Sequence, residues 1–219
     1  MPTETTTPRQ RFEALDEQTQ ARWLVPAEAE FCEHGFEKAS LNRIIARAGE
    51  SKGRTYHYFA DKGALFCATL ERRVRQCDFL DQVSEAASAP NATGYWLELG
   101  ALCARLTKML QGDDRLASLL RTLHRESAAQ QSFAEPLAAI RGAIDDLLVA
   151  GQSIGAVRDD LPITLLTEVA LNLIATVDRW FALNGSTLSE DAEAALSQRA
   201  FLLLMAPLLP SQFTEGISL

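Results

Sequence analysis

The sequence predicts an all-α protein in which an N-terminal three-helix domain precedes a larger helical domain. Apolar residues recur at helical spacing along most of the chain, and hardly any segment shows the alternating pattern of a strand. Gly, Pro, Asn and Asp residues punctuate these periodic segments at helix-length intervals. The 219 residues, 47% of them hydrophobic, are enough to bury a substantial core.

This punctuation places the elements in order. Residues 1–18 are polar and predict a flexible arm, in which Arg9 and Arg11 either contact DNA phosphates or belong to a disordered tail. Helices at about 20–34, 41–48 and 52–58 form a domain over residues 19–65. A long helix from about residue 63 to 87 leads into a second domain over residues 66–219. Its further helices are expected at about 95–110, 112–127, 133–154, 162–183 and 189–206.

The segment from Ser40 to Lys62 predicts two short helices joined by a sharp turn. Ser40 and Ser51 are suited to cap the two helices, and Gly49 is suited to a left-handed turn between them. The first helix carries an apolar stripe, and the first turn of the second exposes cationic side chains. This combination is typical of a helix-turn-helix, whose second helix enters the DNA major groove.

The distribution of charge supports the same interpretation. The chain has a formal net charge of −8, which at first sight is unsuited to a DNA-binding protein. Residues 38–62, however, contain six Lys or Arg residues and two acidic ones, a net charge of +4. The positive charge is therefore concentrated on the predicted helix-turn-helix, and phosphate would repel the acidic remainder.

At these residues the chain resembles the tetracycline-repressor (TetR) family of bacterial transcription regulators. The resemblance covers about 45 residues, and the rest of the chain matches the family only in length, helicity and the Gly155–Pro162 segment. The matched positions are Ala29, Phe31, Gly35, Phe36, Ile45, Ala46, Ala48, Gly49, Ser51, Lys52, Gly53, Tyr56, Tyr58, Phe59, Lys62 and Leu65.

Three residues depart from the pattern of that family. Pro26 stands where the first helix usually runs unbroken, so we expect that helix to begin or kink there. Glu50 occupies a turn position that is usually apolar, and Thr55 replaces a larger apolar residue of the recognition helix. These two residues predict a slightly under-filled helix-turn-helix core.

The side chains of the predicted recognition helix suggest separate roles. Lys52 and Arg54 are the candidates for contacts to base edges, because their donors match the O6 and N7 acceptors of guanine. Gly53 permits close backbone approach. The remaining candidates are Tyr56 and His57 for bases or phosphates, Ser40, Ser51, Tyr58 and Lys62 for phosphates, and Arg43 for a further base. For His57 and Tyr58, packing between helices is the alternative role.

The resemblance implies that the second domain encloses a ligand cavity with a mostly apolar wall. Its candidate wall residues, of a kind more often found as ordinary core, are Phe66, Trp96, Cys103, Met109, His124, Asp178 and Trp180. Asp178 would favour a cationic ligand, and pairing with Arg179 or Arg141 is the alternative role for this residue. Ligand binding would tilt the helix at 63–87 and so change the separation of the two DNA-binding domains of a dimer.

The last two helices predict how the chain assembles. Apolar residues surround nearly the whole helix from Ile163 to Leu183, so it must be buried on more than one side. In the TetR family the last two helices pair with their copies in a homodimer, whereas composition alone also allows a buried monomer core. A two-fold dimer predicts a palindromic DNA operator.

The predicted function is therefore a ligand-responsive transcriptional repressor that binds double-stranded DNA and is released by a small-molecule effector. The alternative is a helical carrier or partner-binding protein with a degenerate DNA-binding head. An enzyme is not expected, because the Gly151–Gly155 match to a hydrolase elbow lacks a preceding strand and a downstream His. We expect no cofactor, no metal site, no membrane segment and a cytoplasmic location.

Overall fold

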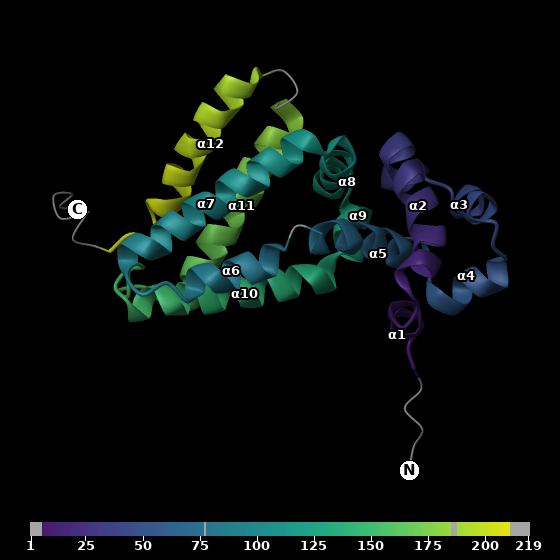
Figure 1. The fold of residues 1–219 in the computed structure, drawn as a ribbon, viewed down its shortest axis with the longest axis horizontal. Coiled ribbons are helices and arrows are strands. Elements are labelled where there is room, and N and C mark those ends of the chain that lie inside the picture. The colour runs from purple at the N-terminus through teal and green to yellow at the C-terminus, as the bar shows by residue number, and fades with distance from the viewer. Residues whose placement is uncertain (1–5, 77, 185–187, 211–219) are drawn as a thin grey trace, which may run out of the picture. The chain divides into compact units, whose positions relative to one another are not determined.

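The computed structural model describes residues 6–76, 78–184 and 188–210, which form helices and contain no strand (Figure 1). The prediction of an all-α fold is therefore confirmed. The chain divides into two compact units, of which unit 1 comprises Met1–Gln76 with Asp114–Glu135, and unit 2 comprises Cys77–Asp113 with Pro136–Leu219. Each unit has its own hydrophobic core.

Unit 1 is built around the long helix α2 (Glu17–Lys38), which packs against α3 (Leu41–Ala48), α5 (Lys62–Arg75) and α8 (Asp114–Arg125). Helix α1 (Pro8–Glu13) packs on α4 (Lys52–Tyr58), and α9 (Ser127–Ser132) packs on α5 and α8. The core contains several side chains with no exposed surface: Trp23, Phe31, Ile44, Leu65 and Phe66. This core fixes the positions of the two short helices that carry the site.

Helices α3 and α4 have the bounds that the sequence predicted. Ser40 Oγ accepts a hydrogen bond from Arg43 N, and Ser51 Oγ accepts one from Arg54 N, so each serine caps its helix. Gly49 adopts the left-handed conformation with φ 67°. The helix-turn-helix is thus formed by its own caps and turn.

Helix α2 begins earlier than expected, and the predicted start or kink at Pro26 is wrong. Asp16 caps the helix ahead of Glu17, and Gly35 (φ 70°, ψ −178°) is the residue within α2 whose backbone is not helical. A Cβ on Gly35 would lie 2.5 Å from Glu126 Oε1. The two oxygens of Glu126 accept hydrogen bonds from Phe36 N and Glu37 N, and so they satisfy the amides exposed by the break.

The residues that follow the N-terminus are helical, although we expected a flexible arm over residues 1–18. Residues 1–5 lie outside the described part, but α1 is capped by Thr7 and closed by a capping box with Gln10. Phe12 on this helix is 4% exposed, and its ring centroid lies 4.5 Å from that of Phe59. An aromatic anchor of this size is the feature that fastens α1.

Unit 2 contains α6 (Phe79–Ala87), α7 (Ala92–Gly112), α11 (Ile163–Asn184), α12 (Glu190–Met205) and most of α10 (Ala134–Ser153). Helix α7 packs on α6 and α12. Tyr95 lies at the centre of the core, where its hydroxyl donates a 3.1 Å hydrogen bond to Leu147 O. A Cβ on Gly151 would lie 2.5 Å from Val157 and 2.8 Å from Tyr95, so this glycine permits the close packing of α10.

The predicted single helix at 63–87 is two helices, α5 and α6. Asp78 separates them with φ 47°, a left-handed conformation that Asp tolerates better than most residues do. The predicted domain boundary at 65/66 also differs from the compact units, because α5 packs with α2 and α9 and belongs to unit 1. The boundary at 65/66 separates a DNA-binding domain from a ligand-binding domain, and this functional division stays a prediction.

Candidate DNA-binding surface

Helix α4 presents a polar and aromatic face to solvent. Lys52, Gly53 and His57 are exposed, and Tyr56 is 53% exposed although it is a large aromatic residue. Nothing lies within 4 Å of the position that a Cβ on Gly53 would occupy. Lys52 supplies a cation on this face, and Tyr56 and His57 supply further hydrogen-bonding groups. Gly53 has no side chain to keep the backbone away from DNA. Contact with a DNA groove requires such features.

Arg54 lies on the same turn but is held by its neighbours. Its NH1 group donates a 3.2 Å hydrogen bond to Glu50 Oε2, and its Cζ lies 5.5 Å from the ring centroid of Trp23. The side chain is nevertheless 47% exposed. The four-residue spacing of Glu50 and Arg54 is compatible with this ion pair, whereas the contact of Arg54 with Trp23 has no local signal.

Thr55 is a buried polar residue behind α4 whose hydroxyl is hydrogen-bonded, and the predicted under-filling of this core stays a prediction. Thr55 is 0% exposed, its hydroxyl accepts a 3.2 Å hydrogen bond from Trp23 Nε1, and it donates a 3.0 Å hydrogen bond to Ser51 O. A Thr is therefore accommodated because a buried Trp supplies the polar partner that it requires.

Two of the predicted DNA contacts are tied to α2. The Arg43 Nε group donates a 2.8 Å hydrogen bond to Glu30 Oε1, and Ser40 N donates a 2.9 Å hydrogen bond to the same oxygen. Burial of Glu30 opposes its ionisation, but these hydrogen bonds outweigh that effect and lower its pKa. The side chain of Arg43 remains 49% exposed, so it lies on the surface beside α4.

The Lys62 side chain binds backbone carbonyl groups of its own chain. Its ammonium donates hydrogen bonds to Phe36 O, Glu37 O and Ala39 O at 2.6, 3.0 and 3.2 Å. These carbonyls lie at the end of α2, and a cation there satisfies them and complements the helix dipole. Contact of Lys62 with phosphate stays a prediction, and it would require the ammonium to leave at least one of these carbonyls.

The end of α4 is fastened by α1. Arg11 donates two hydrogen bonds to His57 O, from Nε at 3.1 Å and from NH2 at 3.0 Å. The ring of Tyr58 is half-buried and contacts Trp23 at a centroid separation of 5.2 Å. Tyr58 therefore packs between helices, whereas the ring of His57 stays exposed.

Comparison with known proteins identifies this arrangement. The model of the family described as bacterial regulatory proteins, tetR family, matches residues 24–69, which include most of α2, all of α3 and α4, and the first half of α5. Residues 24–69 are therefore a TetR-family DNA-binding segment. This family and the relatives of the chain are transcriptional regulators, not enzymes.

Relatives of this chain are named as repressors. It is 29% identical over 150 residues to the HTH-type transcriptional repressor SCO4008 of Streptomyces coelicolor, covering 67% of this chain and 71% of that protein. It is 28% identical over 139 residues to the HTH-type transcriptional repressor Rv1474c of Mycobacterium tuberculosis, covering 62% of this chain and 67% of that protein.

A solved structure shows that the fold extends beyond the helix-turn-helix. The transcriptional regulator FadR from Bacillus subtilis, in complex with stearoyl-CoA, matches with a TM-score of 0.67. The match covers 85% of this chain and 98% of that one at 20% sequence identity. At this identity the likeness establishes a shared fold.

The residues predicted to line an effector cavity are divided between the two units. Phe66 and His124 belong to unit 1, where Phe66 is 0% exposed and contacts Phe31 at a centroid separation of 5.0 Å. The other five lie in unit 2 on α7 and α11: Trp96, Cys103, Met109, Asp178 and Trp180. Phe66 is therefore part of the core that supports the helix-turn-helix.

The carboxyl group of Asp178 acts on the thiol of Cys103 within unit 2. Asp178 is solvent-accessible, yet the protein that surrounds it raises its pKa to about 6 by desolvation. Desolvation and the charge of Asp178 together raise the pKa of Cys103 to about 11. Arg141 pairs with Glu168, and no described cation forms an ion pair with Asp178.

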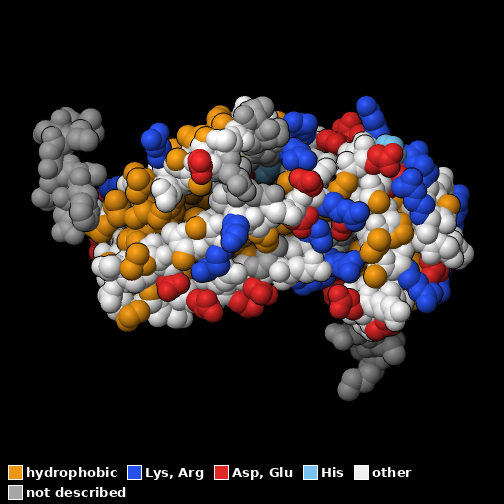
Figure 2. Space-filling view, turned by 45° about the horizontal axis from the view of Figure 1, so that its top comes forward, with side chains coloured by type: hydrophobic (Ala, Val, Ile, Leu, Met, Phe, Trp, Pro, Cys, Tyr) orange, Lys and Arg blue, Asp and Glu red, His pale blue; other side chains and the backbone are white. Residues whose placement is uncertain are grey.

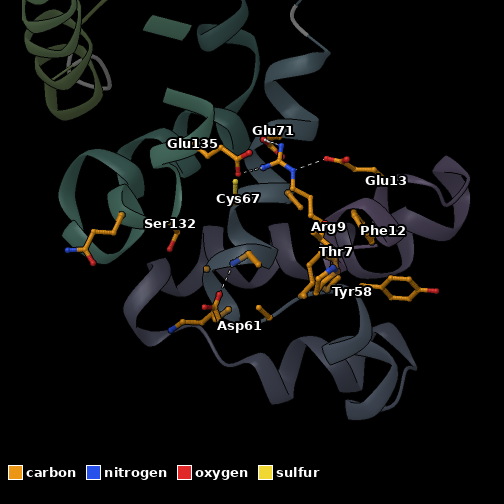
Figure 3. Close-up of a pocket in the computed structure, with 18 of the residues that line it drawn as sticks. Thr7, Arg9, Phe12, Glu13, Tyr58, Asp61, Cys67, Glu71, Ser132 and Glu135 are labelled. Carbon is orange, nitrogen blue, oxygen red and sulfur yellow. Dashed lines mark hydrogen bonds and ion pairs between the residues drawn. The ribbon is translucent and has the colours of Figure 1, made fainter. Parts of the chain in front are cut away.

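A cavity of about 730 Å³ lies in unit 1 among α1, α5 and α9 (Figure 3). Arg9 bridges three carboxylates at its wall, those of Glu13 at 2.8 Å and of Glu71 and Glu135 at 2.9 Å. None of the seven residues predicted for the effector site lines this cavity. Its most polar part is filled by these ion pairs, which connect α1 to α5 and α10.

The described residues hold no cluster of His, Cys, Asp and Glu arranged for a metal ion. Cys32, Cys67 and Cys103 are unpaired, and Cys77 lies outside the described part of the chain. Ser153 follows a helix rather than a strand, and its hydroxyl donates to Ala150 O at 2.7 Å, so the hydrolase elbow is not formed. No helix among the described residues is long and apolar enough to cross a membrane.

Proposed function

We propose that this protein is a ligand-responsive repressor that binds a palindromic DNA operator as a homodimer and leaves it when a small-molecule effector binds. The observation that carries this proposal is the exposed face of α4, with Lys52, Arg54, Tyr56 and His57 on a capped and well-packed helix-turn-helix. Repression follows the names of the relatives SCO4008 and Rv1474c. Binding to chromosomal DNA would place the protein in the bacterial cytoplasm.

The homodimer would form through α11 and α12. These helices expose large apolar side chains: Leu165, Trp180, Leu183, Leu202 and Leu203, with exposed fractions from 45% to 62%. Figure 2 shows hydrophobic side chains gathered on the face of unit 2 that carries α12. A patch of this kind supports an interface with a second copy, whose recognition helices would then lie about 34–36 Å apart.

The effector would bind unit 2 near Asp178. The fold shared with FadR, which was solved with stearoyl-CoA, supports a small-molecule site, and the accessible carboxyl of Asp178 supports a ligand with a positively charged group. Because α5 and α6 are separate helices, a tilt of one continuous helix at 63–87 is not available as the signal. The effector must instead bias how the two units are arranged.

A carrier with a degenerate DNA-binding head is the alternative, and the polar residues Glu50 and Thr55 are the feature that favours it. Glu50 and Thr55 are polar residues in a predicted apolar core, but Thr55 is fully hydrogen-bonded and Glu50 contacts two arginines. The reading helix is therefore supported as a folded binding element.

The experiment is selection of genome-derived DNA fragments by the purified protein at a fixed salt concentration, because phosphate contacts make affinity depend on salt. We expect one palindromic sequence to be enriched. Replacing both Lys52 and Arg54 with Ala should cost about 1–3 kcal/mol of binding free energy for each base that these side chains recognise. The control is the double variant Lys108→Ala and Arg125→Ala, which removes two positive charges from α7 and α8 instead of α4. It should leave the enriched sequence unchanged.

If no DNA sequence is enriched, the proposal of a DNA-binding repressor is contradicted, and the alternative of a helical carrier protein is favoured. The effector is tested separately, by adding stearoyl-CoA and a panel of organic cations to the protein–operator complex. A compound that binds unit 2 should lower operator affinity, and saturating binding without that effect would contradict the proposed release.

A further inference from the structure

Glu50 is a carboxylate placed directly behind the reading helix. It lies in the turn between α3 and α4, and its side chain is only 6% exposed. One carboxylate oxygen accepts the hydrogen bond from Arg54, and the other lies 3.8 Å from Arg22 NH1 on α2. A single acid thus connects the reading helix to the helix that supports it.

Arg54 is also restrained by an aromatic ring. Its guanidinium lies over Trp23, and that indole cannot easily turn because it is 0% exposed and hydrogen-bonded to Thr55. An Arg between a carboxylate and an aromatic face is limited to few rotamers. The N–H donors that Glu50 does not use remain available, since the side chain is 47% exposed.

Lys52, which precedes Arg54 by two residues, has no comparable restraint. Among the described residues no hydrogen bond or ion pair is formed by its side chain, and the residue is exposed. A flexible ammonium contributes charge without a fixed direction, whereas a guanidinium of fixed direction can match the paired acceptors of guanine. The two cations of the first turn are therefore unequal.

We infer that Glu50 is a positioning residue for sequence recognition, which directs Arg54 toward one base pair of each half-site while Lys52 supplies affinity with little discrimination. This inference rests on the proposed function, because it requires an operator. It follows from the geometry of Glu50, Trp23 and Arg54, and it gives a role to a residue that the sequence marked only as a departure from the family.

The test uses full-length protein and the selected operator with each base pair substituted in turn. Arg54→Ala should lose discrimination at one symmetry-related pair of positions, and Glu50→Gln should lower discrimination at the same positions by about fivefold or more. In the Arg54→Ala background, Glu50→Gln should cause no further change there. Lys52→Ala should lower affinity for all operator variants by a similar factor.

Glu33→Gln is the matched control, since it removes a carboxylate from α2 that is 61% exposed and whose neighbours His34 and Arg47 lie no closer than 3.7 and 4.0 Å. Thermal unfolding establishes that each variant is folded. If Glu50→Gln does not fold, Glu50→Asp keeps the charge but withdraws it from Arg54 and should produce the same position-specific loss.

Two results would overturn the inference. If Glu50→Gln retains full discrimination, or loses it equally at all positions, Glu50 supports the fold without positioning Arg54, and the proposed function still holds. If the wild-type protein selects no operator, the proposed function fails and the positioning role fails with it.

Discussion

At the scale of single residues, buried carboxylates organise the helix-turn-helix unit. Glu30 is 0% exposed and accepts hydrogen bonds from Arg43 and from the backbone of Ser40, while Glu28 is 5% exposed and pairs with Arg115 at 3.1 Å. Buried acids of this kind are tolerated only when several donors satisfy them. Helical periodicity in the sequence shows on which face of a helix an acidic residue lies. It does not show whether a cationic residue far away in the sequence forms an ion pair with that acid.

The variant Glu30→Gln tests this network. The lowered pKa of Glu30 means that its ionised form stabilises the fold above the unfolded-state pKa near 4.5, and that this stability is lost as pH falls through the folded-state value. We expect the variant to be less stable than the wild type by about 1–3 kcal/mol at pH 7. Urea denaturation at pH 7 and pH 3 should show the difference shrinking at the lower pH.

Glu33→Gln, in which the lost carboxylate is mostly exposed, should change stability by less than about 0.5 kcal/mol. A constant difference between the Glu30 variant and the wild type at both pH values would show that packing, not ionisation, is responsible.

Asp178 has the opposite dependence on pH. Its pKa is raised from 3.8 to about 6, so the folded state favours the protonated carboxyl and loses stability as pH rises through about 6. Asp178→Asn should therefore be more stable than the wild type at pH 8 and equally stable near pH 3.5, measured by denaturation at one protein concentration. Lower stability of the variant at pH 8 would mean that the ionised carboxylate has a favourable partner in the assembled protein.

At the scale of elements, helix ends in this protein are fixed by identifiable side chains. Ser40, Ser51, Asp16 and Asn91 cap four helices, and these residue types are the ones that sequence analysis expects at such positions. The end of α2 differs, because Lys62 and Glu126 satisfy its exposed backbone groups from other helices. A helix end that depends on distant residues has no local signature.

Gly35→Ala tests the break in α2. The φ of 70° disfavours any L-residue, and the new Cβ would collide with Glu126, so we expect a loss of about 1–3 kcal/mol in the free energy of unfolding. Gly142→Ala on α10 is the matched control, since nothing lies within 4 Å and an Ala should stabilise that helix by about 0.5–1 kcal/mol. Equal effects from the two substitutions would contradict the strained backbone at Gly35.

At the scale of the whole molecule, the chain forms two units whose composition is not sequential. Helices α8 and α9 lie more than 35 residues after α5 in the sequence, yet they complete unit 1 by packing on α2 and α5. Unit 1 therefore contains residues of both predicted domains, the DNA-binding domain at 19–65 and part of the effector domain at 66–219.

Leu203→Glu tests the proposed dimer. Leu203 is 57% exposed on α12, and burying a carboxylate there should raise the dimer dissociation constant by about tenfold or more. Sedimentation equilibrium measures the change. Leu137→Glu places the same charge on α10 at a residue that is 44% exposed and should leave the dimer intact. If both variants sediment as the wild type does, α12 is not the interface.

The sequence by itself determined the elements whose signals are local. The bounds of α3 and α4, their serine caps, the left-handed Gly49 and the cationic first turn of α4 all depend on residues within a few positions of one another. Only the tertiary structure revealed the break at Asp78 and the hydrogen bonds that the Lys62 ammonium donates to carbonyl groups of α2. It also revealed that Glu50 and Trp23 together restrain Arg54. The hydrogen bonds of Lys62 and the packing of Arg54 on Trp23 depend on contacts between different helices, and the partner in such a contact leaves no trace in local periodicity.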